Sequence, residues 1–191
     1  MKKTVWQPLV IGVLLGLLAG IATASGLSFI TPGINIENAI GVWMTLILLS
    51  AALGGPLAGT IASTLFVIIA TLLGPPDMKE ILSDPVNFWS NLIVVGIIMI
   101  VVGFVYRFIF ERSKMPTRLL FWAGIVIAVY IIISPITISF QFYLHGEAGV
   151  LPAIMSSYGI FLPQAIFDII ITSLVFVALP ARYARPLWYE F

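Results

Sequence analysis

The stretch LSAALGGPLAGTIAS, residues 49–63, places a Gly-Gly-Pro triplet inside a long apolar region. Pro56 suits the first position of a helix, because its missing N–H would have no partner there. The two preceding glycines permit a tight reversal of the backbone. We therefore predict two helices, over residues 39–53 and 56–73, that form a hairpin with almost no loop.

The composition assigns the whole chain to the membrane. Of its 191 residues, 61% are hydrophobic and only 9% are charged, whereas soluble domains carry about 25% charged residues. Several apolar runs approach the roughly 20 residues that a helix needs to cross a bilayer. We predict an all-α integral membrane protein, in which a single domain over residues 1–191 forms a six-transmembrane-helix bundle. The predicted helices cover residues 6–28, 39–53, 56–73, 88–110, 119–141 and 158–179.

Basic residues are distributed unevenly between the two sides of this predicted bundle. Cytoplasmic loops carry the excess of Lys and Arg in membrane proteins. One side holds eight of them: Lys2, Lys3, Arg107, Arg112, Lys114, Arg118, Arg182 and Arg185. The other side holds Lys79 together with five acidic residues: Glu37, Asp77, Glu80, Asp84 and Glu147. The asymmetry predicts an even number of spans, with both termini cytoplasmic.

The first predicted span has a competing interpretation as a cleaved secretory signal, because two lysines precede it and the small-residue run ATASG follows. Its apolar stretch is longer than a usual signal core. It also carries a ridge of small residues at four-residue spacing: Gly12, Gly16, Gly20 and Ala24. Such a ridge lets another helix approach closely, which favours a retained span. Two roles remain open for the ridge: packing against this chain's own helices, or docking a helix of a partner protein.

Enzymatic chemistry finds little support in the sequence. The chain has one histidine, His145, and no cysteine, so a thiolate site is excluded and a metal site or catalytic dyad is not specified. It contains neither a Walker-type glycine loop nor a nucleophile elbow. We predict no catalytic residue, no metal, no cofactor and no nucleic-acid partner.

Polar side chains inside the predicted spans are more informative, because a polar group in hydrocarbon is costly unless it faces the bundle interior or a cavity. Residues of the last three spans could line a substrate pocket open to the outside. The candidates are Asn87, Trp89, Asn91, Tyr130, Ser134, Gln141, Gln164 and Asp168. The alternative is a hydrogen-bond network that holds the helices together. Asp168, the one ionisable residue near the middle of a span, is then either a ligand contact or a protonated structural residue.

Two segments resemble a known family. They are PGINIENAIGVWMTLILLSAALGGPLAGTIASTLFVIIATLLGPP, residues 32–76, and YGIFLPQAIFDIIITSLV, residues 158–175. The Gly55-Pro56 turn, Gly74 before an external loop and the Pro163-Gln164 pair are similar to features of the substrate-binding S-components of energy-coupling factor (ECF) transporters. The resemblance spans nearly the whole chain, although each motif is short and degenerate.

The resemblance implies a specific function. S-components bind a vitamin or similar micronutrient from outside and then join a transmembrane coupling subunit and two ATPase subunits. The small-residue ridge on the first helix would contact the coupling subunit, with glycines where the family has alanines. The segment FITPGINIEN, residues 29–38, would form a gate over the ligand.

Two other functions remain possible at this stage. Residues 52–74 also resemble the multi-span sensor domain of LytS-type histidine kinases. The third possibility is a small membrane assembly protein that binds no ligand.

Overall fold

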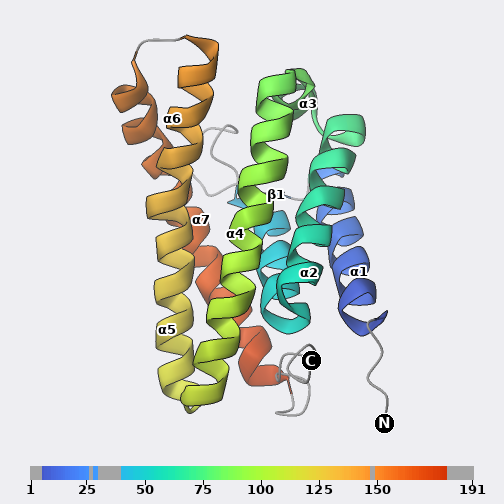
Figure 1. Cartoon of the computed structure of the whole chain (residues 1–191), viewed down its shortest axis with the longest axis vertical. Helices are drawn as coiled ribbons and strands as arrows, with labels where there is room; N and C mark the ends of the chain where they lie inside the picture. The colour runs from blue at the N-terminus through green and yellow to red at the C-terminus, as the bar shows by residue number, and fades with distance from the viewer. Residues whose placement is uncertain (1–5, 26–27, 30–39, 147–148, 180–191) are drawn as a thin grey trace.

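The computed structural model describes residues 6–25, 28–29, 40–146 and 149–179, and these are almost entirely helical (Figure 1). The elements in chain order are α1 (Trp6–Ala24), β1 (Ser28–Phe29), β2 (Ile40–Gly41), α2 (Val42–Leu73), α3 (Pro76–Ser83), α4 (Pro85–Arg112), α5 (Met115–Ala128), the π-helical segment η2 (Val129–Ile133), α6 (Ser134–His145) and α7 (Val150–Ala178). The two short strands pair antiparallel, with Ser28 opposite Gly41.

Five helical segments are long and apolar enough to cross a membrane. They are Trp6–Ala24, Val42–Leu73, Pro85–Arg112, Met115–Ile132 and Phe161–Ala178. Large apolar side chains are exposed on each of them, such as Leu14, Phe104 and Leu174, as expected for surfaces that face lipid. The chain is therefore a multi-pass, all-α membrane protein. The predicted count of six separate spans is not confirmed, because residues 42–53 and 56–73, which belong to the predicted second and third spans, fall within the single element α2.

α2 reverses direction at the predicted turn. Gly55 has φ 81° and ψ −171°, which interrupts the helix. A β-carbon on Gly59 would lie 2.7 Å from the β-carbon of Ala51, whereas eight residues of straight helix would separate them by about 12 Å. The helix of residues 42–54 thus folds back on that of residues 56–73, which confirms the predicted hairpin. A β-carbon on Gly103 of α4 would come within 2.6 Å of the Pro56 nitrogen, so α4 packs directly on this turn.

The first half of α2 begins inside the bundle. Residues 42–54 rise about 20 Å at 1.5 Å per residue, too little for a hydrocarbon core of about 30 Å. Figure 1 shows this half starting beside the middle of α7 and descending to the reversal. A predicted span as short as residues 39–53 can tilt, lie buried in the bundle or thin the membrane locally, and the structure favours burial. Six of its side chains are no more than 1% exposed: Thr45, Ile47, Leu48, Ser50, Ala51 and Ala52.

The small-residue ridge of α1 packs against the second half of α2. A β-carbon on Gly12 would lie 2.9 Å from the Ala58 Cα, and one on Gly16 would lie 2.8 Å from the Ala62 Cα. Gly20 is equally close to the Ile69 side chain, while Ala24 is half-buried. In this structure the three glycines are covered by their own chain, because backbones this close leave no space for another helix. This favours the packing interpretation over partner docking.

Several other boundaries differ from the predicted ones. α1 ends at Ala24 and β1 follows, α4 and α7 begin earlier than predicted, and the loop expected after Leu73 contains the short helix α3. The predicted span 119–141 is one continuous helical segment made of α5, η2 and α6. Its irregular part, η2, ends two residues before Pro135. Pro135 has no N–H to bond the Ile131 carbonyl, which disturbs the helix just before it.

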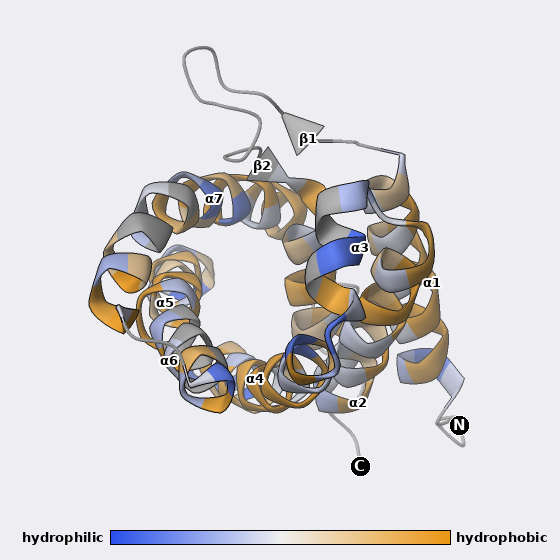
Figure 2. Ribbon diagram, turned by 90° about the horizontal axis from the view of Figure 1, so that it is seen from above, coloured by the Kyte–Doolittle hydropathy of each residue, from blue (hydrophilic) through white to orange (hydrophobic). Residues whose placement is uncertain are grey.

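The helices and their connections define two ends of the bundle. α1 starts and α7 ends at the same end as the α4–α5 connection, and α3 and the α6–α7 connection lie at the other (Figure 1). Seen along the bundle, α2 lies between α1 and the other long helices, and β2 lies beside α7 (Figure 2). Hydrophilic residues gather at α3 in this view.

Candidate functional site: a buried polar layer and an outer cleft

Three polar side chains form a stripe along α7 and are buried in the bundle. Gln164, Asp168 and Thr172 are spaced one turn apart and are 6%, 0% and 0% exposed. Each bonds a different part of the chain, so the stripe joins α7 to β2, α2, η2 and α5. All three side chains therefore face the interior of the bundle.

The Gln164 side chain forms two hydrogen bonds with the backbone of β2. Its side-chain oxygen accepts from the Gly41 N–H at 2.7 Å, and its amide donates to the Gly41 carbonyl at 2.8 Å. Gly41 is the last residue of β2 and the residue just before α2. The two bonds therefore fix where the first half of α2 begins.

Asp168 accepts hydrogen bonds from three side chains. The Thr45 hydroxyl and the Gln164 amide donate to Oδ1, the latter at 3.0 Å, and the Tyr130 hydroxyl donates to Oδ2 at 2.6 Å. Thr45 lies in the first turn of α2, and the N-terminal end of a helix carries a partial positive charge. The carboxyl group is thus stabilised by donors and by a helix end, and no Lys or Arg among the described residues pairs with it.

Thr172 continues the network toward α5. It donates to the Asp168 backbone carbonyl at 2.5 Å and accepts from the Trp122 indole N–H at 2.7 Å. Trp122 packs edge-on against Tyr106 and Phe176, with ring centroids 5.2 and 5.3 Å away. These three aromatic side chains are fully buried. They fill the bundle between the polar layer and the α4–α5 end.

Three departures from regular helix surround Asp168. Tyr130 belongs to η2, Pro163 precedes Gln164 inside α7, and the first half of α2 starts at Gly41. π-helical segments occur frequently at functional sites. A backbone irregularity at membrane depth is tolerated only where protein buries it or where it lines a cavity. The polar layer is therefore the strongest internal candidate for function.

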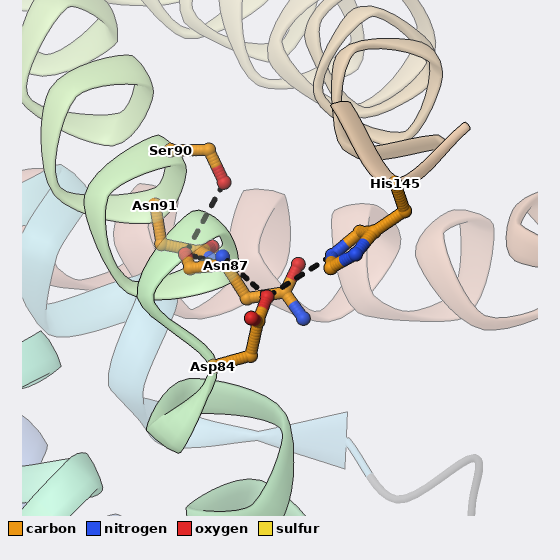
Figure 3. Close-up of polar contacts among 5 residues, drawn as sticks. All are labelled: Asp84, Asn87, Ser90, Asn91 and His145. Carbon is orange, nitrogen blue, oxygen red and sulfur yellow. Dashed lines mark hydrogen bonds and ion pairs between the residues drawn. The ribbon is translucent and has the colours of Figure 1, made fainter. Parts of the chain in front are cut away.

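A second polar cluster lies at the outer start of α4 (Figure 3). The Asp84 carboxylate accepts from the Asn87 N–H at 3.0 Å and so caps the helix. His145, at the end of α6, places Nε2 3.0 Å from the same Asp84 oxygen. Asn91 donates to the Asn87 carbonyl at 2.8 Å. The cluster joins the outer ends of α4 and α6.

Below the Asp84–His145 contact, a cleft of about 510 Å³ opens between α4 and α6. Its lining residues are Pro85, Val86, Trp89, Ser90, Ile93, Val94, Ile136 and Leu144. Of the predicted substrate-binding residues whose side chains the structure describes, Trp89 is the one that lines this cleft. Asn87 and Asn91 share its helix but do not contribute to this lining.

The predicted pocket residues thus fall into two groups. Tyr130, Gln164 and Asp168 meet in the polar layer, while Asn87, Trp89 and Asn91 lie at the outer end of α4. Ser134 and Gln141 belong to α6, and the positions of their side chains lie outside what the structure describes. Most of the segment 29–38, expected as a gate, also lies outside the described residues.

The sequence reasoning missed two members of the network, Thr45 and Trp122. Thr45 offers a signal, since it is one of two hydroxyl residues in the apolar run 42–54. Trp122 offers none, because an indole in a membrane helix usually serves as an apolar or interfacial group. In the part of the chain that the structure describes, no three His, Asp or Glu side chains lie close enough together to bind a metal ion.

Comparison of the chain with known protein families, with characterised proteins and with solved structures finds no match. Functional inference for this chain accordingly rests on its own residues and geometry.

Proposed function

We propose that the chain is the membrane-embedded substrate-binding subunit of a micronutrient uptake system, of the kind that S-components provide. The observation that carries the proposal is the start of α2 at mid-bundle, where Thr45 in its first turn donates to the buried Asp168 carboxyl group. Secondary transporters build substrate sites near the bilayer midplane from discontinuous helices of this kind.

In this proposal Asp168 organises the site. Its three donors come from α2, η2 and α7, and its complete burial leaves it no exposed surface for a ligand in this structure. The network therefore holds β2 and the start of α2 against α7. The substrate binds on the outer side of this layer.

The orientation of the proposed protein follows from charge. Arg107, Arg112, Lys114 and Arg118 lie around the α4–α5 connection, and Lys79 lies on α3. Under the positive-inside rule the α4–α5 end is cytoplasmic. In this proposal both termini lie on the cytoplasmic side of a prokaryotic plasma membrane. A transmembrane coupling subunit and two ATPase subunits complete the proposed system. They would contact faces other than the Gly12–Gly20 side of α1, which α2 covers.

Native mass spectrometry of gently purified protein tests the proposal. We expect a small molecule retained in a one-to-one ratio with the chain. Thermal unfolding in the presence of each B vitamin should show an increase in melting temperature with one of them. Absence of any retained molecule, together with no stabilisation by any vitamin, would contradict the proposed function.

Thiol labelling tests the orientation separately, because the chain contains no cysteine. We expect single cysteines at Asp84 and Glu147 to react with an impermeant reagent in intact cells, and one at Lys114 to react only after the membrane is opened. Labelling of the Lys114 position in intact cells would show that the orientation is the reverse of the proposed one.

A further inference from the structure

We propose that the α4–α6 cleft binds the body of the substrate, and that this substrate is an uncharged, mainly apolar small molecule with a polar group at one end. This inference rests on the proposed function and specifies the chemistry of its ligand. α6 forms an apolar wall of the cleft opposite α4, a role that the sequence did not predict. That role comes from Ile136 and Leu144, which face α4 across the cleft.

The size of the cleft fits a small organic molecule. Its volume of about 510 Å³ falls within the range of roughly 300–1,000 Å³ that small-molecule sites occupy. The cleft is formed along one side of α4, where Trp89 and Ile93 recur at one-turn spacing. Trp89 is 56% exposed and Ile93 is 55% exposed, so both present large surfaces to an occupant.

The chemistry of the walls specifies the body of the ligand. Among the described residues that line the cleft, none is charged and Ser90 is the one that carries a hydroxyl. A charged group placed against this wall would lose its hydration without gaining a partner, which is strongly unfavourable. The body of the ligand must therefore be uncharged, and the Trp89 indole provides an apolar surface on which a flat ring packs well.

The outer end of the cleft specifies the polar group. Pro85 and Leu144 line the cleft, and their chain neighbours Asp84 and His145 meet at 3.0 Å beside them. The Asp84 and His145 side chains are 32% and 34% exposed, so water and solutes reach them. A hydroxyl or amide at one end of the ligand would hydrogen-bond this pair. Because the pair lies at the α3 end of the bundle, the ligand enters from the outer aqueous side and not from the lipid.

A matched pair of positions tests the site. Ile93 and Ile97 lie one turn apart on α4 and are 55% and 56% exposed, but only Ile93 lines the cleft. Single-cysteine variants Ile93→Cys and Ile97→Cys, each carrying a trifluoromethyl tag, are placed in phosphatidylcholine nanodiscs. Naphthalen-2-ylmethanol, an apolar ring system with one hydroxyl, is then titrated while fluorine NMR is recorded. We expect a saturable shift of the signal at position 93 and only a small, linear shift at position 97.

A lipid chain is the competing occupant, and a second measurement distinguishes it. The same two proteins are prepared with phosphatidylcholine that carries a nitroxide on its acyl chain. If the cleft admits lipid, the signal at position 93 broadens at least as much as the signal at position 97, and naphthalen-2-ylmethanol produces no saturable shift. That result would overturn the proposal. Weaker broadening at position 93 together with the saturable shift supports it.

A filling variant separates this inference from the proposed function. Ile93→Trp adds bulk to the cleft, and Ile97→Trp adds the same bulk one turn away. In native mass spectrometry we expect the first variant to lose the retained molecule and the second to keep it. Retention by both variants would leave the proposed function intact and refute the cleft as its site.

Discussion

The two halves of α2 have similar apolar sequences and opposite surroundings. Residues 42–54 are enclosed by protein, and the side chains of Ile47, Leu48 and Ala51 are fully buried. Residues 56–73 bury one side against α1 and leave Leu57 and Leu72 48% and 65% exposed. Hydrophobicity alone does not distinguish these environments, because lipid and a protein interior are both apolar. The difference shows that polar groups and close backbone contacts, more than apolar content, determine where a membrane helix lies.

The largest expected effect concerns the contact that buries one side of the second half. Gly16→Leu forces a side chain into a position where even a β-carbon would be 2.8 Å from the Ala62 Cα. We expect the free energy of unfolding in mixed micelles to fall by about 3 kcal/mol, at the upper end of the cost of overpacking. Gly124→Leu is the matched control, because a β-carbon there meets nothing within 4 Å. If Gly16→Leu keeps normal stability and ligand binding but abolishes uptake, the ridge docks a partner after all.

The reversal that separates the two halves should be the next most sensitive feature. Gly55 has φ 81° and ψ −171°, a backbone conformation that is essentially restricted to glycine. We expect Gly55→Ala to lower the free energy of unfolding by about 2 kcal/mol. The same denaturant titration on Gly124→Ala, at a helical position, should show little change. Equal stability of the two variants would mean that the backbone turns by another route.

A pair of threonines compares the polar content of the two halves. Thr45 in the first half donates to Asp168, whereas Thr71 in the second half bonds only the Val67 carbonyl of its own helix. We expect Thr45→Val to destabilise the protein by about 1 kcal/mol, because the buried carboxyl group loses a donor. Thr71→Val should have almost no effect on the unfolding curve. If Thr71→Val lowered the free energy of unfolding more than Thr45→Val, the hydrogen bond to Asp168 would not explain why the first half of α2 lies inside the bundle.

The smallest effect should have the opposite sign. Within the described residues the Ser50 hydroxyl is buried and has no hydrogen-bond partner, whereas Ser63 donates to the Thr60 carbonyl at 2.9 Å. An unsatisfied buried hydroxyl is costly, so we expect Ser50→Ala to increase stability by about 0.5 kcal/mol. Ser63→Ala should decrease it slightly. Destabilisation by Ser50→Ala would indicate that this hydroxyl has a bound partner in the membrane.

Much of the fold could be predicted from local signals. The Gly-Gly-Pro reversal, the helical segments and the charge asymmetry follow from residues whose physical effects act within a few positions. The stripe of Gln164, Asp168 and Thr172 was also predictable, since its spacing places three polar groups on one side of a helix. The partners of that stripe were predicted only in part. Tyr130 was predicted to lie in the same pocket or hydrogen-bond network as Asp168, but Thr45, which was not predicted, lies 123 residues away from Asp168 in sequence.

The sequence by itself therefore determined that this protein lies in a membrane, where its helices run, and which side chains must avoid lipid. Only the tertiary structure decided what those groups contact: Gly16 meets Ala62, Gln164 holds Gly41, and α6 faces α4 across a cleft. The physical reason is the difference between transfer and packing. Transfer from water to lipid depends on each residue's own chemistry and can be read along the chain. Packing depends on which surfaces fit at close range, and distant parts of the chain supply those surfaces.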